Sequence, residues 1–116
     1  MTDDPSVLDR LAGIIQDRKK NPPPRSYTTS LMQGGVEKIG AKVLEEAAEV
    51  VDAARELANQ DNDTDAETGH LVAEAADLVY HLLVMLGYFD LTLAPVEIEL
   101  DRRFGVSGLD EKEARD

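Results

Sequence analysis

Two long segments of the chain repeat apolar residues every three to four positions, and this periodicity constrains the fold more than any other feature. In the first segment, about Val36 to Asn59, the stripe consists of Val36, Ile39, Val43, Ala47, Val50, Ala54 and Leu57. In the second, about Thr68 to Phe89, the main stripe consists of Leu71, Ala75, Leu78, Leu82, Met85, Leu86 and Phe89. Each spacing marks one face of an α-helix. The pattern predicts two long helices joined by a polar loop at residues 59–68.

Shorter helices are predicted on either side of this pair. Apolar residues from Val7 to Ile15 lie on one helical face, and the prolines at 22–24 end that helix because they lack the N–H group. Residues 26–34 read as a short helix or turn closed by two glycines. A last helix is expected near 94–104, with Thr92 as its N-cap. No segment alternates with period two, so we expect an all-α bundle of about four to five helices.

The second long helix has little polar surface. Besides its main stripe it carries the further apolar residues Val72, Ala76, Val79, Tyr80, Leu83 and Val84. A helix that is apolar nearly all round is buried on several sides, so a homodimer or higher homo-oligomer is expected to complete the core. Residues 1–104 are predicted to form one domain, and residues 105–116 a charged, flexible tail.

The charge balance excludes several classes of partner. The chain has 116 residues with 24 acidic and 12 basic side chains, a net charge of −12. This disfavours binding to nucleic acid or to an anionic membrane, both of which attract basic proteins. The chain has no cysteine, which excludes disulfides and thiol chemistry. No apolar run of membrane-spanning length stands out, so a soluble cytoplasmic protein is expected. A salt-loving host and an ordinary acidic protein explain the charge equally well.

The acidic loop at residues 59–68 has one functional alternative. Asp61, Asp63 and Asp65 alternate as in an EF-hand calcium loop. The sixth position of that loop is Ala66 rather than glycine, and the twelfth is Val72 rather than glutamate. The loop is therefore interpreted as a solvated connection.

Carboxylates at the edges of the two apolar stripes carry the functional signal. Glu46 and Glu49 are three residues apart on the first helix, as are Glu74 and Asp77 on the second. Residues at this spacing are neighbours on a helix surface. We call the pair Glu46 and Glu49, and the pair Glu74 and Asp77, the two pincers. If the helices pair antiparallel, the two pincers can face each other. Acidic residues also fill many exposed helix faces, so one pair alone would be ordinary surface.

Four carboxylates at close range repel one another and require protons or a cation. Ligands that are all oxygen select a hard ion, Mg²⁺ or Mn²⁺. Magnesium also accepts substrate phosphates, which allows an acidic chain to hold a polyphosphate. A di-iron bundle is the nearest chemical alternative, but it uses Glu-x-x-His pairs. Here Asp77 follows Glu74 at that spacing, and Leu78 precedes His81.

The sequence resembles a known enzyme family. The carboxylate pattern resembles the MazG-like superfamily of all-α nucleoside-triphosphate pyrophosphohydrolases. The segments Ser26–Leu31, Lys42–Glu49, Glu74–Val84 and Leu91–Leu93 are more specifically similar to the phosphoribosyl-ATP pyrophosphohydrolases of histidine biosynthesis. The resemblance covers about residues 7–103. The acidic loop looks longer than is usual in the family, and Pro95 stands where an acidic residue is common; neither departure touches the pincers.

The resemblance implies an ATP-binding hydrolase that uses Mg²⁺. Its reaction would convert phosphoribosyl-ATP to phosphoribosyl-AMP and pyrophosphate, the second step of histidine biosynthesis. By position, the metal ligands would be Glu46, Glu49, Glu74 and Asp77. Glu45 would bind a second metal or orient the attacking water as a catalytic residue. The family also implies a homodimer or a larger oligomer.

Other polar residues near the pincers are candidates for binding substrate. Lys38 and Lys42 lie on the flank of Glu46 and would pair with phosphates, unless they form salt bridges within the helix. Arg25 and Tyr27 precede the helix and would contact the phosphoribose, unless they have surface or packing roles. His81 is expected to orient a ligand carboxylate, or to be a satisfied polar group, rather than to bind Mg²⁺.

Two other functions remain open from the sequence. A house-cleaning hydrolase of ordinary or damaged nucleoside triphosphates would use the same metal with another pocket. A non-catalytic helical interaction module would not need the carboxylates at all.

Overall fold

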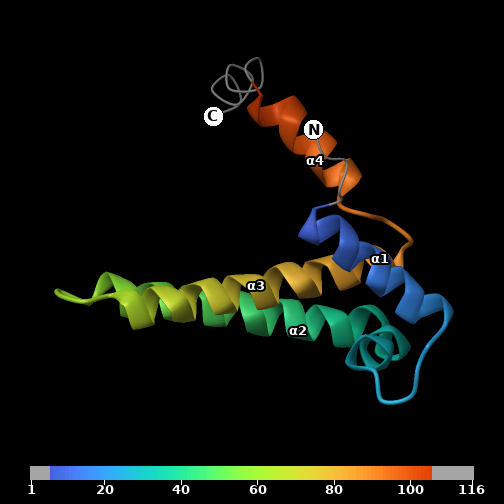
Figure 1. Ribbon diagram of the computed structural model, residues 1–116, viewed down its shortest axis with the longest axis horizontal. Helices are drawn as coiled ribbons and strands as arrows, with labels where there is room; N and C mark the ends of the chain where they lie inside the picture. Colours follow the sequence, from blue (N-terminus) through green and yellow to red (C-terminus); the bar gives the residue numbers. More distant parts are fainter. Residues whose placement is uncertain (1–5, 106–116) are drawn as a thin grey trace.

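The computed structural model describes residues 6–105 and contains four α-helices in that range, with no strand. Their bounds are α1 Val7–Lys20, α2 Tyr27–Ala58, α3 Asp65–Tyr88 and α4 Ala94–Phe104. Helices α2 and α3 lie side by side and run antiparallel, with the acidic loop joining them at one end (Figure 1). Helix α1 crosses the opposite end of the pair. The expected all-α class is confirmed.

Helix α2 is continuous apart from a kink at Gly35. This residue has φ 70° and ψ −164°, a backbone conformation that suits glycine. The kink separates a short first segment from the long helix, as the sequence predicted. Ser26 is the N-cap residue of α2, and its Oγ accepts a hydrogen bond from the Thr29 N–H at 3.1 Å.

The start predicted for α3 is wrong by three residues, and the N-cap predicted for α4 is wrong by one. Helix α3 begins at Asp65 rather than Thr68, because Thr64 acts as the N-cap residue without a side-chain cap. Helix α4 is preceded by Leu93 at the N-cap, not by Thr92. The Thr92 Oγ1 still accepts a hydrogen bond from the Ala94 N–H at 3.3 Å.

The core lies where α1 crosses the α2–α3 pair. It consists of Ile15, Leu31, Ile39, Leu83 and Val84. The Lys19 ammonium donates hydrogen bonds to the backbone carbonyls of Gly87 and Tyr88, at 3.2 and 2.8 Å. These bonds satisfy carbonyl groups at the end of α3 that have no partner within the helix, and they fix α1 to that end of the pair.

The buried faces of both long helices are rotated relative to the predicted stripes. On α2, Glu46 and Ala53 are buried, whereas Ala54 is exposed. On α3, His81 is buried, whereas Leu82 is 44% exposed. Helix α3 thus turns its polar flank toward α2 and leaves part of its apolar stripe in solvent.

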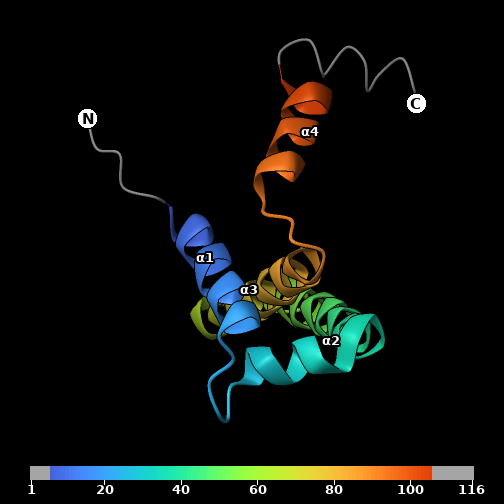
Figure 2. The ribbon, with the colours of Figure 1, turned by 90° about the vertical axis from the view of Figure 1, so that its right-hand side faces the viewer.

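Helix α4 projects away from the other three helices (Figure 2). Its side chains Ile98 and Leu100 are 70% and 50% exposed. The predicted tail at 105–116 lies outside the described residues except for Gly105.

Within residues 6–105, α3 is the one helix long and apolar enough to cross a membrane by length and composition. Glu74 and Asp77 interrupt its apolar residues, so α3 passes this test by its mean hydropathy and not as an unbroken apolar run. A core helix of a soluble protein passes the same test. Helix α3 also carries two carboxylates and a histidine along one flank, which suits packing against α2.

Candidate metal site

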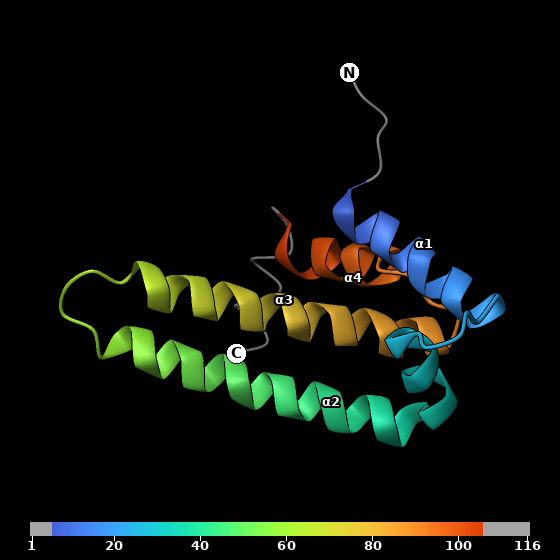
Figure 3. The same cartoon turned by 60° about the horizontal axis from the view of Figure 1, so that its bottom comes forward.

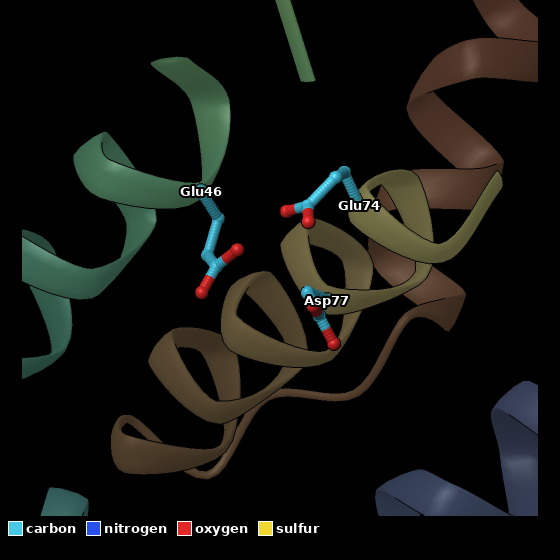
Figure 4. Close-up of side chains that lie close together, drawn as sticks. All are labelled: Glu46, Glu74 and Asp77. Atoms are coloured by element: carbon cyan, nitrogen blue, oxygen red, sulfur yellow. The ribbon is translucent and has the colours of Figure 1, made fainter. Parts of the chain in front are cut away.

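Three carboxylates from the two long helices converge at the centre of the α2–α3 pair. Glu46 comes from α2, and Glu74 and Asp77 come from α3 (Figure 4). One carboxylate oxygen from each lies within 4.8 Å of the others. The antiparallel pairing seen in Figure 3 brings together residues about 30 positions apart in sequence. The predicted convergence of the two pincers is thus present for these three side chains.

Glu46 and Glu74 lie in surroundings that disfavour a bare negative charge, whereas Asp77 is exposed. Glu46 is 6% exposed. The Oε2 atoms of Glu46 and Glu74 are both buried, and no group among the described residues donates a hydrogen bond to them. A buried carboxylate oxygen without a partner is costly, so these two atoms call for a proton or a cation.

Glu49 of α2 contributes to the raised pKa values of both Glu46 and Glu74. Burial, followed by a hydrogen bond with Glu49 and the nearby negative charges, raises the pKa of Glu46 from 4.5 to about 7. The hydrogen bond with Glu49 is also the largest cause of the raised pKa of Glu74. Glu49 thus lies near both Glu46 and Glu74. Its part in the metal site stays a prediction.

Glu45 forms a salt bridge instead of joining the three converging carboxylates. Its Oε2 lies 2.6 Å from the Lys42 Nζ. The same Nζ lies 3.8 Å from the Oε1 of Glu46. The alternative role considered for Lys42, a salt bridge within the helix, is therefore realised in the structure. Lys42 still places a positive charge at the edge of the cluster.

Lys38 and Arg25 lie outside the cluster. The Lys38 Nζ donates a hydrogen bond to the Ser30 Oγ at 2.5 Å, across the kink in α2. Arg25 has a positive φ of 62° in the turn before α2. It lines a cavity of about 550 Å³ together with Pro22, Pro23, Pro24, Ser26, Thr29, Ser30 and Gln33. Both side chains are accessible, and neither contacts the carboxylates.

Tyr27 and His81 connect the start of α2 to the middle of α3. The His81 Nδ1 lies 2.7 Å from the backbone carbonyl oxygen of Asp77, to which it donates, so its Nε2 accepts the Tyr27 hydroxyl hydrogen at 2.8 Å. Tyr80 completes an aromatic group with these two rings. His81 is therefore a satisfied buried polar residue, and it contacts the backbone of Asp77 rather than its carboxylate.

His70 lies beside the cluster and was not among the site residues predicted from the sequence. Its Nε2 lies 3.4 Å from the Oε1 of Glu74, and its Nδ1 lies 3.3 Å from the Oε2 of Glu56. The four-residue spacing from His70 to Glu74 was the available signal. The link to Glu56 on α2 depends on the pairing of the helices and is not visible in the sequence.

Comparison with known proteins identifies relatives along the whole chain. A profile of the family described as phosphoribosyl-ATP pyrophosphohydrolase matches residues 8–104. A phosphoribosyl-ATP pyrophosphatase of Geotalea daltonii is 44% identical over 116 residues, covering 100% of this chain and 99% of the relative. The proteins of the same name from Nitrosospira multiformis and Trichlorobacter lovleyi are both 46% identical. These alignments cover 97% and 99% of this chain, and 85% and 98% of the relatives.

These matches agree with the geometry of the site. The matched residues include all four helices except Val7 at the start of α1, and every carboxylate of the cluster. The identity is well above the level at which only the fold would be shared, and it extends over nearly the full length of both chains. The chain belongs to the phosphoribosyl-ATP pyrophosphohydrolase family.

Proposed function

We propose that the carboxylates of α2 and α3 hold Mg²⁺, or Mn²⁺ in its place, for the hydrolysis of phosphoribosyl-ATP. The products are phosphoribosyl-AMP and pyrophosphate. As a member of its family the chain is a phosphoribosyl-ATP pyrophosphatase, a hydrolase of histidine biosynthesis. The metal, its ligands and the substrate contacts are the proposed part.

The observation that carries the proposal is the pair of buried, unpartnered oxygens on Glu46 and Glu74. One carboxylate oxygen of each of these residues and of Asp77 lies within 4.8 Å of the others. A hard divalent ion satisfies oxygens of this kind without a hydrogen-bond donor. Glu49, which contributes to the raised pKa values of Glu46 and Glu74, completes the proposed ligand set.

The proposed reaction is the attack of water on phosphorus in the α–β linkage. The new P–O bond forms as the bond to the leaving pyrophosphate breaks, and the proton of the water passes to a carboxylate. The bound ion would neutralise phosphate charge and acidify a bound water. Glu45 is the proposed proton acceptor, because its salt bridge with Lys42 leaves it outside the three converging carboxylates.

Side chains of α2 and of the turn before it are proposed to bind the substrate. Lys42 is closest to the cluster, since it lies at 3.8 Å from Glu46. Lys38 can reach a phosphate only by releasing Ser30. Burial raises the pKa of Tyr27, and the positive charge of Lys42 opposes this rise. Tyr27 therefore lies near Lys42. Arg25 is proposed to bind the phosphoribose from the cavity it lines.

A second copy of the chain is proposed to cover the exposed apolar surface of α3 and α4. This surface includes Leu82, Phe89 and Ile98, which are 44%, 57% and 70% exposed. Exposed apolar surface of this kind on a soluble protein marks an interface. The protein is proposed to work in the cytoplasm as a homodimer or a larger homo-oligomer.

A substrate comparison tests the proposed chemistry. The protein is incubated with Mg²⁺ and either phosphoribosyl-ATP or a panel of nucleoside triphosphates, and pyrophosphate release is measured. We expect release from phosphoribosyl-ATP and its loss on addition of EDTA. Release from ordinary triphosphates alone would instead indicate a house-cleaning hydrolase. No release from any substrate would favour the interaction module.

A further inference from the structure

His70 links the two long helices beside the carboxylate cluster. It lies on α3 one turn before Glu74, and its two ring nitrogens contact carboxylates on different helices. Glu56, the partner on α2, lies ten residues beyond Glu46 along that helix. The ring is 48% exposed and is therefore accessible without unfolding.

The two carboxylate oxygens of Glu74 have different surroundings. Oε1 lies 3.4 Å from the His70 Nε2. Oε2 is buried and has no hydrogen-bond partner among the described residues. A carboxylate held through one oxygen presents the other in a fixed direction. Neighbours that orient a ligand in this way commonly determine how tightly a metal site binds.

We propose that His70 is a positioning residue of the metal site. Held by Glu56 on the opposite helix, its ring fixes the Oε1 of Glu74 so that Oε2 is presented to the divalent ion. This inference rests on the proposed metal site. It adds a residue that does not touch the ion and whose contacts also join α2 to α3.

Binding of Mn²⁺ to the full-length protein tests the role without depending on catalysis. Free Mn²⁺ is measured by electron paramagnetic resonance during titration of the wild type, His70→Ala and His70→Gln. We expect His70→Ala to weaken Mn²⁺ binding about tenfold or more. His70→Gln keeps a donor one turn from Glu74, so it is expected to recover part of the affinity.

Two controls separate the positioning role from a general loss of structure. Arg55→Ala removes an exposed salt bridge with Asp52 on the same stretch of α2, at 3.2 Å, and is expected to bind Mn²⁺ as the wild type does. Thermal unfolding in EDTA checks that each variant is folded. Glu56→Gln weakens the other contact of the ring and is expected to reduce affinity less than His70→Ala does.

The outcomes distinguish this inference from the function on which it rests. If the wild type binds Mn²⁺ and folded His70→Ala binds it equally well, the positioning role is wrong and the metal site stands. If the wild type itself does not bind Mn²⁺, the proposed metal site fails first. An equal loss of affinity in His70→Ala and Arg55→Ala would also contradict a specific role for the ring.

Discussion

Glu46 lies on the buried side of α2, close to three other carboxyl groups. Burial and the negative charges of Glu49 and Asp77 disfavour the ionised form of Glu46. The positive charge of Lys42 offsets this effect only in part. A divalent ion would reverse this balance, because it attracts each of these groups. The same residues that repel one another in the metal-free protein would then stabilise the complex.

This repulsion predicts a dependence of stability on pH. The pKa of Glu46 is raised from 4.5 to about 7 in the folded chain, so between these values the folded state binds more protons than the unfolded state. The free energy of unfolding contributed by Glu46 therefore falls as the pH rises across this interval. We expect the melting temperature in EDTA to decline more steeply for the wild type than for Glu46→Gln. Parallel curves for the two proteins would contradict the raised pKa.

Replacement of a proposed ligand should separate catalysis from folding. Asp77→Asn removes a charge needed for the ion while keeping the size of the side chain. Loss of several kcal/mol of charge stabilisation corresponds to a fall in kcat of about a hundredfold or more. Pyrophosphate release and melting temperature are measured together. A folded Asp77→Asn variant with normal activity would show that Asp77 is not a ligand needed for catalysis.

Residue spacing predicted the cluster, because carboxylates three apart share a helix face whatever the fold. It could not predict the inward position of Glu46, which depends on the rotation of α2 against α3. It also could not assign His81, since the choice between a backbone carbonyl and a carboxylate as its partner depends on the rotamer. The metal ligands and substrate contacts stay predictions.

At the scale of the helices, the kink in α2 determines how the first turns of that helix meet α3. The helix changes direction at Gly35. In the segment before this kink, Thr28 contacts the Tyr80 hydroxyl and Tyr27 contacts His81. These contacts join the start of α2 to the helix that carries Glu74 and Asp77. The kink therefore helps to set the surroundings of the site.

A side chain at Gly35 should destabilise the protein. An added Cβ would lie 3.4 Å from the Tyr88 hydroxyl, and φ of +70° disfavours L-residues in any case. Gly35→Ala is expected to lower the free energy of unfolding by about 1–3 kcal/mol in urea. Gly13→Ala is the matched control, since it lies in a helix with nothing within 4 Å of the new Cβ. That control is expected to gain about 0.5–1 kcal/mol. Equal effects of the two substitutions would contradict the strain argument.

Helix positions followed from periodicity and from the breaks at proline and glycine, which act locally. The apolar periodicity predicted the buried face of each long helix less accurately than its position in the sequence. Helix α3 is apolar on most sides, so its pattern fits several rotations about the helix axis. Contact with α1 and the polar pairing with α2 select one of them, and Leu82 then faces solvent.

At the scale of the whole molecule, the single chain leaves much apolar surface uncovered. Helix α4 does not pack closely against the other described helices, and Ile98 is 70% exposed among the residues that the structure describes. Leu82, Met85, Leu86, Leu93 and Val96 line a cavity of about 240 Å³ between α3 and the start of α4. A second copy would bury this surface.

Charges placed on this surface should shift the protein from oligomer to monomer. Analytical ultracentrifugation of the wild type is expected to give a dimer or a larger species. Leu82→Glu and Ile98→Glu together are expected to lower the mass to that of one chain. Leu44→Glu changes an exposed leucine on α2 and serves as the control, with no change in mass expected. A wild-type monomer would contradict the proposed assembly.

The proposed activity depends most on a divalent ion bound between α2 and α3. Anomalous X-ray diffraction from crystals soaked in Mn²⁺ locates that ion directly. We predict a peak bounded by oxygens of Glu46, Glu74 and Asp77, at about the 2.1 Å typical of a hard divalent ion. A crystal in which these side chains point apart into solvent, with Mn²⁺ absent or bound elsewhere, would contradict the account.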